Sequence, residues 1–320
     1  MPTPLAARLI GTFGGQTPGP LFIVIAALHG NEPAGVRALE LVFEQLEKER
    51  RDNPGFSFRG KLVGLIGNLQ AFQTGQRFVE RDLNRVWTED FLKRSKASPK
   101  EDLAAESREA RELFEAVSAE CQSCDSEKIV FLDLHTTSAE GGIFSIPIDE
   151  GESLALAKHL GVPAIVGLQQ SISGTLLGYA AEGRFFSEFG VRNSEFGILC
   201  VAFEAGQHES PHATTRSALA IVRCLRALHC IEQEGMAGFM GKLSLPFFGA
   251  VSPVVRLCYA HHIGLEDGFR MRPGYANFQP IRQGEHLADD VRGPVLSPEK
   301  GLILMPLYQA KGSDGFFIVQ

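Results

Sequence analysis

The chain has 320 residues, and its 31 lysines and arginines against 38 acidic residues give a formal net charge of -7. Apolar residues make up 44% and charged residues 22%, a composition that excludes intrinsic disorder over the bulk of the chain. The mild acidity argues against a general nucleic-acid-binding protein, which usually carries a basic face. No apolar run reaches the roughly 18–20 residues that a membrane-spanning helix needs, so no membrane partner is expected.

The cysteines and the N-terminal residues point to a cytoplasmic, reducing location. The six cysteines are too few and too scattered for a disulfide scaffold. The first residues lack the basic stretch and the apolar core of a signal peptide.

Apolar runs that alternate with helical patterns predict an α/β fold. Residues 21–28 (LFIVIAAL) form a continuous apolar run, which is typical of a strand buried on both faces. After the turn HGNEPAG, apolar residues recur every three to four positions, as on an amphipathic helix. Further strands are predicted over residues 61–67, 129–134, 143–147, 164–168 and 197–203, and further helices over residues 99–117, 152–160 and 213–234. This order indicates a largely parallel or mixed sheet flanked by helices.

Two later segments differ from this pattern. Residues 93–115 are rich in charge and are predicted to be a short loop that leads into the solvated face of a helix. Residues 238–320 are rich in glycine, proline and short apolar runs, which predicts a smaller all-β domain. The glycine-rich segment GMAGFMG is the expected boundary, so the domains would be residues 1–237 and residues 238–320.

Residues that bind metals follow two of the predicted strands. His29 and Glu32 lie in HGNE after one strand, and His135 follows the other in DLHTT. Ligands collect beyond the carboxyl ends of strands in open α/β sheets, and two imidazoles with one carboxylate suit Zn²⁺. Asp133 shares a strand face with His135 and is either its outer partner or a backbone acceptor. The alternative is a helix-capping Glu32 beside histidines without a ligand role.

The segment RFVERDLNR lies between two predicted strands and carries Arg77, Asn84 and Arg85. Arginine binds a carboxylate through two parallel hydrogen bonds, and asparagine adds a donor. These residues would suit an anionic substrate. The alternative is surface charge balanced by Glu80 and Asp82.

Glu204 in FEAG ends the last predicted strand of this region. A carboxylate at such a position, close to a metal, can take a proton from water and later donate it. The alternative is a buried or paired structural glutamate. His208 and His212 follow in the next loop, where a histidine without a catalytic role is the simpler interpretation.

In this order, HGNE, RFVERDLNR, DLHTT and FEAG resemble the succinylglutamate desuccinylase/aspartoacylase family. Its members are zinc-dependent amidases related to the carboxypeptidase A-type fold. The resemblance covers most of residues 20–210, and PGYANFQPIRQGEHLAD and GLILMP are similar to the family's C-terminal domain. It implies a zinc-carboxypeptidase-like mixed sheet flanked by helices, with a smaller C-terminal all-β domain that narrows the active-site entrance.

The resemblance implies one zinc ion per chain, held by His29, Glu32 and His135. It implies that Glu204 activates the attacking water. The ligand types alone also permit Co²⁺ or Mn²⁺.

The arginine segment also acquires roles through the resemblance. Arg77 would polarise the scissile carbonyl, and Asn84 with Arg85 would hold a substrate carboxylate. The implied activity is hydrolysis of the amide bond of a small N-acyl amino acid. A metallocarboxypeptidase that acts on peptides and a non-catalytic carboxylate-binding homologue are the alternatives. A homodimer is compatible with the resemblance.

The sequence departs from aspartoacylases proper at two places. Those enzymes use a further arginine shortly before the catalytic glutamate, whereas this chain has Ser194 near that position and Arg192 out of alignment. They also use a tyrosine near the C-terminus, where this chain has Phe316 and Phe317. Strict specificity for N-acetylaspartate is therefore not expected, and the phenylalanines favour a less polar acyl group or side chain.

Overall fold

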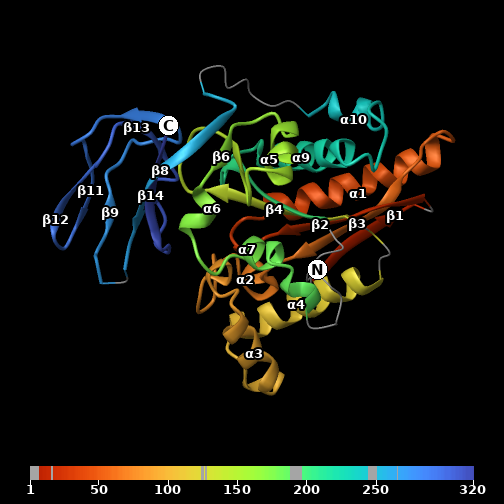
Figure 1. Ribbon diagram of the computed structural model, residues 1–320, viewed down its shortest axis with the longest axis horizontal. Coiled ribbons are helices and arrows are strands. Elements are labelled where there is room, and N and C mark those ends of the chain that lie inside the picture. The colour runs from red at the N-terminus through yellow and green to blue at the C-terminus, as the bar shows by residue number, and fades with distance from the viewer. Residues whose placement is uncertain are drawn as a thin grey trace.

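The computed structural model describes residues 7–15, 17–123, 126, 128–187, 197–243, 251–264 and 266–320. Within these ranges, eleven strands form one mixed sheet that passes through the middle of the molecule (Figure 1). The order in the sheet is β1 (Leu9–Gly14), β3 (Arg59–Ile66), β2 (Thr17–Ala26), β4 (Lys128–Thr137), β7 (Gly197–Gln207), β5 (Phe144–Pro147), β6 (Ala164–Val166), β8 (Val254–His262), β14 (Asp314–Val319), β13 (Gly301–Leu304) and β10 (Gln279–Ile281).

The predicted strands of the α/β region are confirmed, and two of them are longer than expected. Strands β3, β2, β4 and β7 are parallel neighbours, and residues 21–26 of β2 are fully buried, as an apolar run covered on both faces requires. Pairing between β4 and β7 continues to Thr137 and Gln207. His135 and Glu204 therefore lie inside strands and not directly after them.

Helices cover both faces of the sheet (Figure 1). The first face carries α1 (Ala34–Asp52), α5 (Glu152–His159) and α9 (Ala213–Ala227), whose apolar sides form one buried cluster with the sheet. The second face carries α4 (Ala105–Ser123) and α7 (Leu176–Ala181), which belong to a separate cluster. The predicted α/β class, a mixed sheet flanked by helices, is confirmed.

The expectation for the charge-rich residues 93–115 is wrong in two respects. A helix, α3 (Glu89–Ala97), forms there with Thr88 as its N-cap, and the buried face of α4 includes Glu106 and Glu109. Charge pattern alone does not distinguish a solvated carboxylate from one that accepts buried backbone N–H groups. The last predicted helix is also too long, since α9 ends at Ala227.

Short helical segments complete the α/β region. They are α2 (Leu69–Thr74), α6 (Leu168–Ser171), α8 (Arg184–Ser187), α10 (Ala237–Met240) and the 3₁₀ turns η1 (Leu83–Arg85) and η2 (Lys100–Asp102).

The C-terminal region is built from antiparallel strands and lies beside the α/β region (Figure 1). A separate three-stranded sheet contains β12 (Gly293–Leu296), β11 (His286–Asp290) and β9 (Arg270–Met271). The first strand of the C-terminal region, β8, belongs to the large sheet and pairs in parallel with β6, so the large sheet is continuous between the two regions. The division at residue 237 stays a prediction. None of the described helices is long and apolar enough to cross a membrane.

Candidate active site

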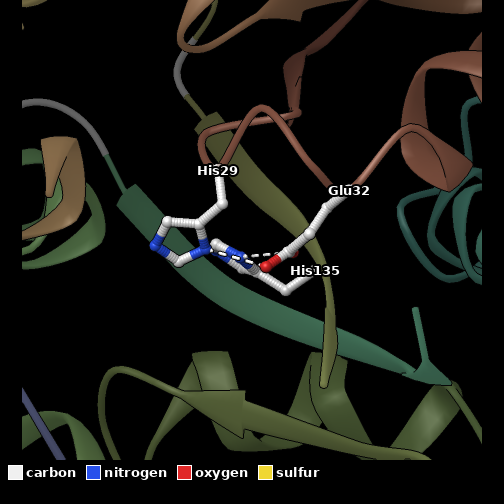
Figure 2. Close-up of side chains that lie close together, drawn as sticks. All are labelled: His29, Glu32 and His135. Carbon is white, nitrogen blue, oxygen red and sulfur yellow. Dashed lines mark hydrogen bonds and ion pairs between the residues drawn. The ribbon is translucent and has the colours of Figure 1, made fainter. Parts of the chain in front are cut away.

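His29, Glu32 and His135 converge in the structure, as predicted (Figure 2). All three are buried, and one potential ligand atom from each lies within 4.8 Å of the others. The Glu32 carboxylate lies between the two rings: Oε1 is 3.0 Å from Nδ1 of His29, and Oε2 is 3.2 Å from Nδ1 of His135. The Glu32 carboxylate also accepts a hydrogen bond from the backbone N–H of Thr136.

Both histidines point their outer nitrogen at a second carboxylate. Nε2 of His29 lies 3.2 Å from Oδ1 of Asp82, and Nε2 of His135 lies 2.8 Å from Oδ2 of Asp133. Such outer partners fix the ring orientation of metal-binding histidines and leave the other nitrogen for the metal. Asp133 is the partner predicted for His135 from the sequence, whereas the sequence offers Asp82 only as balancing surface charge. No local signal separates Asp82 from ordinary surface charge.

The charges in this cluster favour a bound cation. Burial raises the pKa of Glu32, but His29 and His135 outweigh it and hold that pKa well below its usual range. Burial lowers the pKa of His135, but Asp133 and Glu32 outweigh it and raise that pKa well above its usual range. A site that stabilises a proton against burial in this way also stabilises a metal ion in its place, because both are positive charges beside the same carboxylates.

The HGNE motif folds this way because of a close backbone approach. A Cβ on Gly30 would lie 2.1 Å from the backbone carbon of Ala71, so only glycine fits there. Ala27, directly after β2, has φ of 51° in the left-handed region, and the chain turns away from the strand direction there. His29 and Glu32 thereby face β4, where His135 lies.

Glu204 is placed beside this cluster by strand register. It pairs with His135 across the parallel strands β4 and β7, and it is 4% exposed. Its Oε2 has no hydrogen-bond partner among the described residues. Burial raises the pKa of Glu204 to about 7, against the attraction of His135. A buried carboxylate with an unpartnered oxygen and a pKa near neutrality is suited to accept and return a proton.

Arg77 lies against the same cluster. Its guanidinium is 3.0 Å from Oδ2 of Asp82 and 3.7 Å from Oε1 of Glu32. Its Nε is buried and has no partner among the described residues. Arg77 can therefore direct positive charge toward a substrate oxygen close to Glu32.

Asn84 and Arg85 also line the pocket, but both have protein partners. The Asn84 side-chain oxygen accepts a hydrogen bond from the backbone N–H of Leu176. Arg85 donates to Oδ2 of Asp314 at 2.5 Å and to Oγ of Ser313 at 3.1 Å. Asp314 is not among the residues predicted from the sequence, because it lies 229 positions from Arg85 in the chain.

Glu106 holds the loop that carries these groups. Its carboxylate accepts hydrogen bonds from the backbone N–H groups of Val79, Glu80 and Arg81 and from the Asn68 side chain. Glu106 is 1% exposed, so its loss would leave four donors unpaired in a region with little water. Glu106 is therefore a positioning residue for the arginine segment.

We expect Glu106→Ala to lower the free energy of unfolding by about 3 kcal/mol, because removing a buried charged acceptor leaves its donors unsatisfied. Urea unfolding followed by circular dichroism measures this change. Glu101→Ala is the matched control, since Glu101 is exposed and lies five positions earlier. An equal effect of the two substitutions would contradict the positioning role.

The remaining candidates are distributed as follows. His208 is half-buried and outside the pocket lining, with Nδ1 2.7 Å from Oγ1 of Thr136, and burial lowers its pKa. His212 is exposed at the start of α9, outside the pocket lining. Arg192 and Ser194 lie outside the described residues. Phe317 lines the pocket, whereas Phe316 stacks on His261 in the C-terminal cluster.

The protein is thus an α/β protein with a candidate metal centre. Its mixed β-sheet is flanked by helices, and the His29–Glu32–His135 cluster is buried beside the central strands. The family model for the succinylglutamate desuccinylase/aspartoacylase catalytic domain matches residues 18–228. The chain belongs to this family.

Individual relatives are distant. A protein of Nostoc sp. named "Probable aspartoacylase" is 29% identical over 120 residues, which cover 38% of this chain and 36% of the relative. The N-acyl-aromatic-L-amino acid amidohydrolase (carboxylate-forming) of Xenopus tropicalis is 30% identical over 140 residues, which cover 43% of this chain and 41% of the relative. The matched segments thus span less than half of either relative's length.

The fold is shared with solved structures. The crystal structure of succinylglutamate desuccinylase from Vibrio cholerae superposes with a TM-score of 0.64 at 14% identity and covers 95% of this chain and 82% of that one. At this identity the likeness concerns the fold alone.

Proposed function

We propose that the chain is a zinc-dependent amidohydrolase that cleaves the linear amide bond of an N-acyl amino acid. The observation that carries the proposal is the buried cluster of His29, Glu32 and His135 with Glu204 in register beside it. The names of the relatives in its family, aspartoacylase and N-acyl-aromatic-L-amino acid amidohydrolase, support amide hydrolysis.

The donor set of this cluster fits Zn²⁺. His29, Glu32 and His135 would hold one ion per chain, because both Nδ1 atoms and the carboxylate face one point while the Nε2 atoms face Asp82 and Asp133. When bound at such a site, zinc acts as a Lewis acid and lowers the pKa of water to about 7.

The protein's own groups would move the protons and stabilise charge. Glu204 would take a proton from the attacking water and return it to the nitrogen of the leaving amine. Arg77 would stabilise the negative charge that develops on the scissile carbonyl oxygen. Asn84 and Arg85 would hold the substrate carboxylate through their remaining N–H groups.

We also propose that the domain of residues 238–320 narrows the entrance to the site. Met305, Leu307, Gln309 and Ser313, all from this region, line the pocket beside the residues of the α/β region. A wall of this kind favours a small N-acyl amino acid over a long peptide. The cytoplasmic location and the homodimer stay predictions.

The test is a hydrolysis panel on the zinc-loaded protein, read by mass spectrometry. It contains N-acetyl, N-formyl and N-succinyl derivatives of acidic, neutral and aromatic amino acids, together with peptides of two to six residues. We expect release of the free amino acid from one group of N-acyl compounds. Cleavage of peptides alone would indicate a metallocarboxypeptidase, and no cleavage by protein with one zinc per chain would indicate a non-catalytic homologue.

A further inference from the structure

The arginines of the pocket are each paired with a carboxylate. Within the described residues, two arginines, two histidines and four carboxylates line the pocket. Each arginine faces an acidic partner: Arg77 is 3.0 Å from Asp82, and Arg85 is 2.5 Å from Asp314. Neither arginine therefore offers an uncompensated charge. The pocket would be a poor receptor for a substrate with two carboxylates, because each added anion needs its own positive partner.

Asp314 is the carboxylate closest to the proposed carboxylate clamp. It comes from the start of β14, is 12% exposed at its side chain, and contacts both Arg85 and Nδ1 of His262. Arg85 uses Nε for Ser313 and one N–H on each terminal nitrogen for Asn84 and Asp314. Of its five N–H groups, one on each terminal nitrogen has no partner among the described residues. That capacity matches one carboxylate and not two.

The rest of the lining combines polar residues with an apolar set. The apolar residues come from β5, α6, α7, β7, β14 and neighbouring loops, and several belong to the buried cluster on one face of the sheet. The largest of them are Ile146, Leu168, Ile172, Leu177, Met305, Leu307 and Phe317. An apolar group placed against these side chains would be removed from water at no cost in unpaired polar atoms.

We propose that this site selects N-acyl amino acids that carry one carboxylate and an apolar acyl group or side chain, and that Asp314 excludes a second carboxylate. The inference rests on the proposed function and specifies its substrate class. Asp314 is on this basis a specificity-determining residue: its charge compensates Arg85 and repels a further anion at the same wall of the pocket.

The test compares kcat/KM for two apolar and two acidic substrates, using the zinc-loaded full chain. The apolar pair is N-acetyl-L-leucine and N-acetyl-L-phenylalanine, and the acidic pair is N-acetyl-L-aspartate and N-succinyl-L-glutamate. We expect the wild type to favour the apolar pair by at least about 100-fold. Asp314→Asn should raise kcat/KM for the acidic pair about tenfold, because it restores the net positive charge of Arg85.

Asp289→Asn is the matched control, since Asp289 also pairs with a histidine, His286, but lies on β11 outside the pocket lining. Asp289→Asn should leave the ratio of kcat/KM between the apolar pair and the acidic pair unchanged. Equal kcat/KM values of the wild type for the acidic pair and the apolar pair would overturn the inference, whether or not Asp314→Asn folds. A folded Asp314→Asn protein with the wild-type ratio would overturn the role of Asp314.

Failure of the proposed function is distinguishable from failure of this inference. If the wild type cleaves neither these four compounds nor any N-acyl compound of the hydrolysis panel, the proposed function is wrong, and calorimetric titration of the same four compounds decides the inference. The inference is supported if the wild type binds the apolar pair more tightly than the acidic pair and if this difference in affinity is smaller in Asp314→Asn. Equal affinity, or preference for the acidic pair, overturns it.

Discussion

Glu204→Gln is expected to lower kcat about 1,000-fold while KM changes little, because the amide keeps the shape of the side chain but cannot accept a proton. The same substitution should leave the melting temperature equal or higher. Glu204 is buried with one oxygen unpartnered among the described residues, so its charge costs folding free energy that a neutral amide does not. Steady-state kinetics on the best substrate of the hydrolysis panel and thermal unfolding measure the two effects.

The matched control for Glu204→Gln is Glu209→Gln. Glu209 lies five positions later and is exposed, so both kcat and stability should stay at the wild-type level. A Glu204→Gln protein with a kcat within about threefold of wild type would contradict the proton-transfer role, since general acid–base groups contribute at least about 100-fold. A large fall in melting temperature would instead favour the structural alternative for Glu204.

The core of the candidate site could be predicted because its signals are local. A continuous apolar run identifies a buried parallel strand, and a histidine or glutamate at its carboxyl end is then placed at the ligand-binding edge of the sheet. From these signals His29, Glu32 and His135 are predicted to meet at one point, with Glu204 near them. The position of Glu204 directly opposite His135 additionally depends on β4 and β7 being neighbours, which no local pattern specifies.

The supporting residues could not be predicted, because their roles depend on tertiary contacts. Glu106 belongs to a charge-rich stretch whose pattern is typical of a solvated helix face, yet it points inward and accepts backbone N–H groups of the arginine segment. Asp82 looks like surface charge until His29 is seen to contact it. Asp314 meets Arg85 only because β8 continues the large sheet at β6 and β14 pairs with β8.

The arrangement of these supporting carboxylates bears on specificity as well as on stability. Asp82 and Asp133 orient histidines, Glu106 positions a loop, and Asp314 compensates an arginine. Each of these carboxylates uses its negative charge to hold a histidine ring, an arginine side chain or a set of backbone N–H groups in place. The same arrangement leaves the pocket little unpaired positive charge, apart from any metal, for an acidic substrate. The means by which this chain positions its candidate catalytic groups thus also restricts what it can bind.

Removal of the metal should abolish hydrolysis. Dialysis against a chelator is expected to lower kcat/KM at least about 1,000-fold, because the site then lacks its Lewis acid, and one equivalent of Zn²⁺ should restore it. Zinc should also raise the melting temperature, since an ion that binds only the folded chain stabilises it.

His135→Ala should bind less than about a tenth of an equivalent of zinc, because one of three protein ligands is gone. Metal content by mass spectrometry measures this directly.

His212→Ala is the control for His135→Ala. His212 is exposed at the start of α9, so its loss should change neither metal content nor activity. Full activity in protein that holds no metal would contradict the metal-dependent mechanism. Retention of one zinc by His135→Ala would contradict the ligand assignment alone. The two outcomes are separable because the first concerns the chemistry of the reaction, whereas the second concerns only which side chains face the ion in the His29–Glu32–His135 cluster.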